Sequence, residues 1–186
     1  MSYLRKGILL GILICTAASG WAQRAPGVPY LTRNGSDLTG SFQVFVKDTH
    51  LDVGYGVAAS GTEYVTQHLG VRGEFEYSSM NPYDYKEFGL RGGLAYKIHP
   101  REKYQPYIEL LAGYGATKAN GLVVNTGQQI NAFSLLGGGG VDYQLSNRWY
   151  ARVGADVVSN IASKNGNGNK FARSIVGISY HFGNNR

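Results

Sequence analysis

Hydrophobic and polar residues alternate with a period of two along most of the chain, and the last such stretch shows the pattern most fully. In residues 171–182, one face of an extended chain carries alternate apolar positions that end in Tyr180 and Phe182. The other face carries Arg173 and small or polar residues, with Ile175 as the exception. A period of two is typical of a β-strand. The pattern predicts a strand with an apolar medium on one side and a packed polar interior on the other.

The same alternation recurs in earlier stretches, so the chain predicts eight strands and no second domain. The predicted strands are residues 40–47, 53–66, 69–77, 85–98, 107–117, 131–145, 148–159 and 171–182. From the second strand onward, short and long connections alternate, and residues 23–186 contain no run with apolar residues at helical spacing. These features predict an all-β fold, an eight-stranded antiparallel up-and-down transmembrane β-barrel over residues 39–182. An irregular leader over residues 23–38 precedes it, and a short tail over residues 183–186 follows.

The N-terminus predicts a cleavable signal peptide over residues 1–22. Arg5 and Lys6 precede an apolar stretch that is too short to span a bilayer as a helix, and small residues follow it at a plausible cleavage site. Removal of this segment lowers the net charge from +6 to +4, because it contains two basic and no acidic residues. Cys15, the only cysteine, lies within it, so the mature chain has no disulfide and no thiolate metal site.

Tyrosine is abundant, with 14 residues against seven phenylalanines, and the aromatic residues gather near strand ends. Tyrosine favours membrane–water interfaces because its ring is apolar and its hydroxyl is wet. We therefore predict two aromatic belts. The belt near the short connections comprises Tyr64, Tyr96, Tyr107, Tyr143, Trp149, Tyr180 and Phe182, and the belt near the long connections comprises Tyr77, Tyr85, Phe88, Tyr114, Phe133 and Phe171.

Charged residues of both signs occupy the face opposite the apolar one. The predicted interior network comprises Arg72, Glu74, Glu76, Glu87, Arg91, Glu109, Asp142, Arg152, Asp156 and Arg173, with Lys47, Glu63 and Lys97 on the same face. Side chains just fill the interior of an eight-stranded barrel, and an unpaired buried charge is far more costly than a paired one. The pattern therefore favours a structural salt-bridge network, and a gated ion path is the alternative.

With these residues in view, the chain resembles the small eight-stranded outer-membrane β-barrels of the OmpA-type family over residues 39–182. The most specific likeness is Gly177 followed by Tyr180 and Phe182, which resembles the C-terminal insertion signal that the barrel-assembly machinery reads. Ile175 stands where the signal usually has a polar residue, and the chain continues past Phe182. The resemblance implies a protein of the Gram-negative cell envelope, surrounded by outer-membrane lipid, that meets periplasmic chaperones and the assembly machinery during biogenesis.

No other group of residues in the sequence indicates a reactive or ligand-binding site, so we expect no catalytic residue, no metal site and no cofactor. The histidines are divided between the two ends of the predicted barrel, with His50 alone at the end of the long connections, and are not expected to converge. The run 137–140 of four glycines lies in a strand and lacks a following Lys-Ser/Thr, so it predicts close strand packing or a bend in the barrel wall and not a phosphate loop. Basic residues are scattered among acids, which argues against a nucleic-acid partner.

The sequence therefore predicts a non-enzymatic barrel in the cell outer membrane, either structural or binding a partner at the surface. The predicted binding loops are residues 78–84, 118–130 and 160–170, and the loop ligand is unidentified. One alternative is a soluble exported lipocalin-like barrel that binds a small ligand. Lower alternatives are a barrel enzyme that modifies lipid A and a narrow pore.

Overall fold

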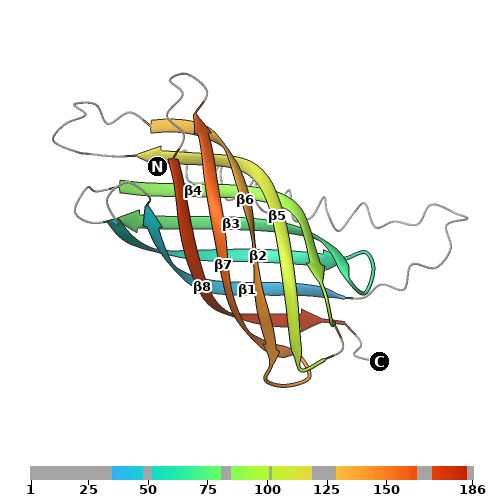
Figure 1. The fold of residues 1–186 in the computed structure, drawn as a ribbon. Coiled ribbons are helices and arrows are strands. Elements are labelled where there is room, and N and C mark those ends of the chain that lie inside the picture. The colour runs from blue at the N-terminus through green and yellow to red at the C-terminus, as the bar shows by residue number, and fades with distance from the viewer. Residues whose placement is uncertain are drawn as a thin grey trace, which may run out of the picture. The chain divides into compact units, whose positions relative to one another are not determined.

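The computed structural model describes residues 35–47, 52–80, 85–100, 102–118, 129–162 and 169–183. These residues form one closed barrel in which eight antiparallel strands follow each other in chain order (Figure 1). The predicted eight-stranded antiparallel barrel is confirmed. The strands are β1 Ser36–Lys47, β2 Asp52–Tyr64, β3 Leu69–Met80, β4 Tyr85–Lys97, β5 Tyr104–Lys118, β6 Gln129–Gln144, β7 Trp149–Ala162 and β8 Asn169–Phe182. The predicted signal peptide, all but the end of the predicted leader and nearly all of the tail lie outside the described residues.

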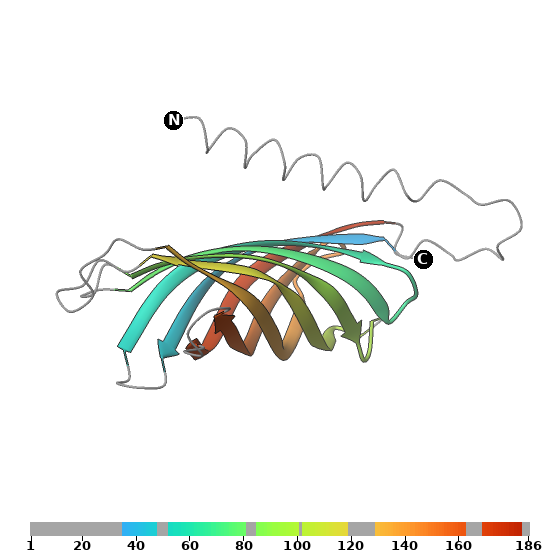
Figure 2. The ribbon, with the colours of Figure 1, turned by 90° about the horizontal axis from the view of Figure 1, so that it is seen from above.

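The barrel closes because β1 pairs with both β2 and β8. Ser36 lies opposite Glu63 on one side and Phe182 on the other, and Lys47 lies opposite Asp52 and Phe171. Seen from above, the strands run obliquely and curve around the barrel (Figure 2). Closure leaves no strand edge with unpaired backbone groups.

The two ends of the barrel differ in their connections. Short turns at residues 65–68, 98–103 and 145–148 join strands at one end, where β1 also begins and β8 ends. We call this the turn end. The connections at residues 48–51, 81–84, 119–128 and 163–168 join strands at the opposite end, the loop end, and lie outside the described residues.

The first strand begins earlier than predicted, at Ser36 and not at residue 40. Gly35 has a φ of 91°, which glycine adopts without strain, and its carbonyl accepts a hydrogen bond of 3.1 Å from the Tyr64 amide. Pairing with β2 and β8 holds the chain extended from there. The last residues of the predicted leader therefore belong to the barrel wall.

Outward and inward faces separate as the period of two predicts. Most large apolar side chains of the described strands point outward and are exposed, among them Leu110 at 67% and Val176 at 61%. Most charged side chains of these strands point inward and are buried, among them Glu76 at 0% and Arg173 at 1%. This arrangement suits an apolar medium outside the wall.

No helix in the part of the chain that the structure describes is both long and apolar enough to cross a membrane.

The glycine run of β6 brings this strand close to β7. A methyl group added at Gly140 would lie 2.1 Å from the Val153 carbonyl oxygen, and one at Gly138 would lie 2.6 Å from the Ala155 oxygen. Real Cβ atoms do not approach backbone atoms this closely. This is the close strand packing that the run predicts, and side chains at these positions would push the two strands apart.

Candidate functional site

The candidate site is the barrel interior, because the charged residues gather there. All ten residues predicted for the interior network are buried, and none is more than 5% exposed. They alternate with apolar residues along β3, β4, β5, β6, β7 and β8, so the strand period turns every one of them inward. Lys97 is buried with them at 5% exposure, whereas the side chain of Lys47 lies outside the described part of the chain.

At the centre, two arginines from β4 and β8 share the two glutamates of β3. Arg173 approaches Glu74 at 2.9 Å and Glu76 at 3.1 Å, and its Nε donates to Asp156 at 2.9 Å. Arg91 approaches Glu74 at 3.4 Å and also pairs with Glu76. Gln43 of β1 accepts from Arg173 at 3.0 Å and donates to Glu76 at 2.9 Å. We call Gln43, Glu74, Glu76, Arg91, Asp156 and Arg173 the central cluster.

Further polar contacts extend the central cluster to the remaining walls. Arg72 Nε lies 3.0 Å from Glu109 Oε2, which joins β3 to β5 over the intervening β4. Glu87 lies 3.7 Å from Arg91 and accepts a hydrogen bond of 2.8 Å from Asn160. These contacts tie β3, β4, β5 and β7 together through the interior, so the network acts as an internal brace.

A second cluster lies at the turn end. Asp37 accepts from the Lys97 ammonium and from the Tyr64 hydroxyl, each at 2.8 Å, and its other oxygen lies 2.7 Å from His181 Nδ1. Deeper inside, Asp142 accepts two hydrogen bonds from Arg152, at 2.6 and 2.7 Å. Lys97 joins the two carboxylates, since its nitrogen lies 3.5 Å from Asp142 as well. A two-pronged arginine–carboxylate pair fixes both side chains in orientation.

Sequence reasoning missed Asp37, Gln43 and Asn160. Asp37 lay in the predicted leader, although the alternation of Leu38 with its neighbours already continues the strand pattern before residue 40. Gln43 and Asn160 carry no charge, so a search for paired charges passed over them. Each of the three is a polar residue at a position that the alternation along its strand turns inward, and this combination is the signal that could have found them.

For several aromatic and charged residues, the predicted direction of the side chain is wrong. Tyr64, Tyr107 and Phe171 were predicted for the belts, but they point inward and are 5%, 3% and 3% exposed. Glu63 was predicted for the interior but is exposed. The errors follow from the alternation of inward and outward positions along a strand. Glu63 shares its face with outward-facing Val57, so the next residue, Tyr64, points inward. Tyr107 packs inside, its ring centroid 4.3 Å from the Arg152 guanidinium.

The other aromatic residues lie on or near the outer surface. Tyr77, Tyr96, Tyr114, Phe133, Trp149 and Phe182 are between 41% and 53% exposed, and Phe88 is 37% exposed. Tyr143 and Tyr180 are half-buried, and the side chain of Tyr85 lies outside the described residues. Tyr180 contacts two rings at the turn end, Trp149 at 4.9 Å and Phe182 at 4.7 Å between centroids. The C-terminal residues Tyr180 and Phe182 thus form one aromatic surface with β7.

An apolar cluster also occupies the interior. Its members are Phe45, Leu111, Leu136, Val158 and Phe171, and none is more than 3% exposed. The rings of Phe45 and Phe171 lie 5.4 Å apart across the β1–β8 seam. Together with the ion pairs, these side chains fill the barrel as expected for eight strands.

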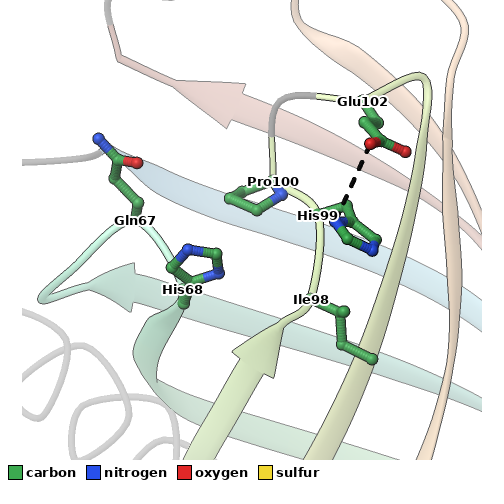
Figure 3. A pocket seen from close by; sticks show the side chains of 6 residues that line it. All are labelled: Gln67, His68, Ile98, His99, Pro100 and Glu102. Atoms are coloured by element: carbon green, nitrogen blue, oxygen red, sulfur yellow. Dashed lines mark ion pairs between the residues drawn. The ribbon is translucent and has the colours of Figure 1, made fainter.

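A small surface pocket of about 190 Å³ lies at the turn end, between the β2–β3 and β4–β5 turns (Figure 3). His68 and His99, which were not expected to converge, both line it. His68 Nδ1 lies 2.8 Å from the Lys97 carbonyl oxygen, and His99 Nδ1 lies 3.9 Å from a Glu102 oxygen. Within the described ranges, no group of three or more His, Cys, Asp or Glu residues is placed to hold a metal ion.

Comparisons with known proteins agree with this geometry. The family profile described as "Outer membrane protein beta-barrel domain" matches residues 8–182. Neisserial surface protein A is similar in structure, with a TM-score of 0.66 and 11% identity over 80% of this chain and 97% of that one. The attachment invasion locus protein Ail of Yersinia pestis has a TM-score of 0.54 and 18% identity, over 80% and 99% of the two chains.

An enzyme shares the same barrel. The outer membrane enzyme PagL has a TM-score of 0.52 and 16% identity, over 77% of this chain and 98% of that one. At such identity the likeness concerns the fold alone. No curated protein matches the chain in sequence.

Proposed function

The chain belongs to the outer membrane protein beta-barrel domain family, and on that premise we propose that it is a non-enzymatic barrel that supports the membrane and binds partners through its loop end. Membership places the protein in the outer membrane. The soluble lipocalin-like alternative is thereby set aside. A lipocalin-like barrel would also carry its charges outside, whereas here Leu110 faces outward and Glu76 inward.

The filled interior is the observation that carries the proposal. Arg173 binds carboxylates of β3 and β7, and Arg91 binds those of β3. Phe45, Leu111 and Phe171 are buried in the same interior. The interior of an eight-stranded barrel is just wide enough for such side chains, which argues against a ligand or a solute stream in the described part of the lumen. Recognition would then fall to the connections between strands, and the longer ones, residues 119–128 and 163–168, join strands at the loop end.

Biogenesis forms part of the proposal. A signal peptide over residues 1–22 would export the chain to periplasmic chaperones, and Gly177, Tyr180 and Phe182 would present the C-terminal signal to the assembly machinery. Two observations support the second step: the ring centroids of Tyr180 and Phe182 lie 4.7 Å apart, and Phe182 is 52% exposed on the outer wall. The signal is therefore an accessible surface in the finished strand.

Phe182→Ala should reduce the amount of assembled barrel in cells severalfold, because it removes the terminal aromatic ring of the signal. The purified variant should refold with nearly unchanged stability, since the ring lies on the exposed outer face. The measurement is the heat-modifiable band in outer-membrane fractions. Phe133→Ala is the matched control, because Phe133 is 53% exposed but belongs to β6. Equal assembly of both variants would show that the terminal aromatic carries no assembly signal.

Planar-bilayer recordings of the purified barrel should show no stable channels. Ion passage would require Arg173, Glu74 and Glu76 to part, and each would then leave a buried charge without its partner. Steady unitary currents that disappear in Arg152→Ala would instead identify a pore lined by the network.

The surface-binding proposal is tested by replacing residues 119–128 and 163–168 with Gly-Ser linkers of equal length. Cells displaying either form are applied to immobilised matrix proteins and glycans, with the heat-modifiable band as the control for folding. We expect at least one probe to retain only the original form. Equal retention of both forms on every probe would contradict binding through the loops, and only the structural role would remain.

The enzyme alternative has a separate test, because PagL shares this barrel. Lipid A from cells with and without the protein is compared by mass spectrometry. We expect the same acyl pattern in both. An altered pattern would overturn the non-enzymatic part of the proposal.

A further inference from the structure

Two exposed cations at the turn end each rest on an aromatic residue of the outer wall. The Lys103 ammonium lies 5.0 Å from the centroid of the Tyr143 ring, and Arg148 Nη1 donates to the Tyr180 hydroxyl at 3.1 Å. Hydrogen bonding to Tyr143 raises the pKa of Lys103, so this ammonium is charged at neutral pH. Each cation thus contacts an aromatic residue at the turn end of the outer wall.

Backbone hydrogen bonds place these cations on the two sides of the β6–β7 turn. The Gln144 amide donates to the Lys103 carbonyl at 2.9 Å, and the His181 amide donates to the Arg148 carbonyl at 2.8 Å. Leu145 begins the turn between them and is 57% exposed. The arrangement is a positively charged rim around an apolar centre. We call Lys103, Tyr104, Tyr143, Leu145, Arg148 and Trp149 the cation–aromatic surface.

The outer wall above this surface is apolar. Val153 is 58% exposed on β7, and Val141 is 38% exposed on β6. Gly137 and Gly139 lie on the same outer face of β6.

The acids of β5 to β8 point into the barrel, and the exposed Glu102 of the neighbouring turn faces His99. The carboxyls of β5, β6 and β7, which are Glu109, Asp142 and Asp156, are all buried inside the barrel. Figure 3 shows the Glu102 carboxyl turned toward His99, and the pair lies 3.9 Å apart. The exposed Glu63 belongs to β2, two strands from β8, and pairs with Ser36 of β1. The described outer face of β5 to β8 therefore carries positive and no negative charge.

From this geometry we infer that the cation–aromatic surface binds an anionic phospholipid of the periplasm-facing leaflet. The lipid phosphate lies over the β6–β7 turn between Lys103 and Arg148, and the acyl chains follow the apolar wall of β6 and β7. The turn end faces the periplasm in barrels of this family, so the partner is a phospholipid. Lysine and arginine near a membrane surface attract anionic lipid, and the aromatic rings hold them at headgroup level.

The test is native mass spectrometry of the mature barrel released from nanodiscs that contain phosphatidylcholine and phosphatidylglycerol in equal amounts. We expect the barrel to retain one phosphatidylglycerol molecule in preference to phosphatidylcholine. Lys103→Gln combined with Arg148→Gln should weaken this retention by about fivefold for each charge removed. Both residues are exposed in turns, so the variant should still fold, and the heat-modifiable band verifies this.

The matched control is Lys86→Gln combined with Lys170→Gln, which removes two exposed charges near the loop end. This variant should retain phosphatidylglycerol as the unmodified chain does. An equal loss in both variants would show attraction by net charge alone, and no loss in the first variant would show that its cations do not bind the lipid. Either outcome overturns the inference, and neither bears on recognition at the loop end.

Discussion

Arg173→Met should lower the free energy of unfolding by about 3–5 kcal/mol, the usual effect of removing one partner from a buried ion pair. The guanidinium contacts Asp156, Glu74 and Glu76 at 2.9, 2.9 and 3.1 Å, and it is 1% exposed. Methionine fills similar space but leaves these carboxylates with fewer cations. Urea unfolding of the barrel in phospholipid vesicles, followed by tryptophan fluorescence, measures the change.

The control is Lys170→Met in the same strand, because Lys170 is exposed and its loss should change stability by less than about 0.5 kcal/mol. Adding Glu76→Gln to Arg173→Met should recover part of the loss, since it removes one of the negative charges left in excess around Arg91. Purely additive effects of the two changes would show that the residues do not interact across the interior.

Gly140→Ala should destabilise the barrel by about 3 kcal/mol, at the upper end of the range for overpacking. The added methyl group would lie 2.1 Å from the Val153 oxygen and 2.6 Å from the Gly154 Cα atom. Both are backbone atoms of β7, so no side-chain rotation can relieve the contact. The wall must separate between β6 and β7, and hydrogen bonds of that ladder should exchange faster by hydrogen–deuterium measurements.

Gly73→Ala provides the comparison for this variant. Gly73 lies in β3, and an added methyl group there would meet no atom within 4 Å. Its stability should be unchanged or raised by about 0.5 kcal/mol, because alanine restricts the unfolded chain. A loss of similar size at both positions would mean that any substitution of a strand glycine is harmful, whatever surrounds it.

The barrel could be predicted from the sequence because lipid on one side and packed charges on the other impose a strict period of two. Arg72 and Glu74 alternate with Val71 and Phe75, and this pattern alone indicates which face of β3 points into the barrel. The number of strands and their order follow from such runs and the turns between them. The period of two also holds where residue types differ little between the two faces, as in β2, whose inner face consists largely of small residues.

The errors arose where residue type was given more weight than the alternation of inward and outward positions along a strand. Tyr107 has the character of a belt residue, yet it shares parity with Glu109 and lies inside against Arg152. The partner of each charge was also out of reach of sequence reasoning. Arg173 meets Glu74 and Glu76, about a hundred residues earlier, because barrel closure and strand stagger bring β3 and β8 to face each other.

The exposed apolar wall has a consequence for how such proteins diverge. Lipid chains adapt to almost any surface, so positions such as Val57, Leu110 and Val176 need only stay apolar. The interior needs complementary charges, but a pair can be exchanged for another pair that fits the same space. Neither requirement preserves particular residues over long times. Natural selection can therefore rewrite most of this sequence while retaining its architecture, and distant relatives of the same shape should share few identical positions.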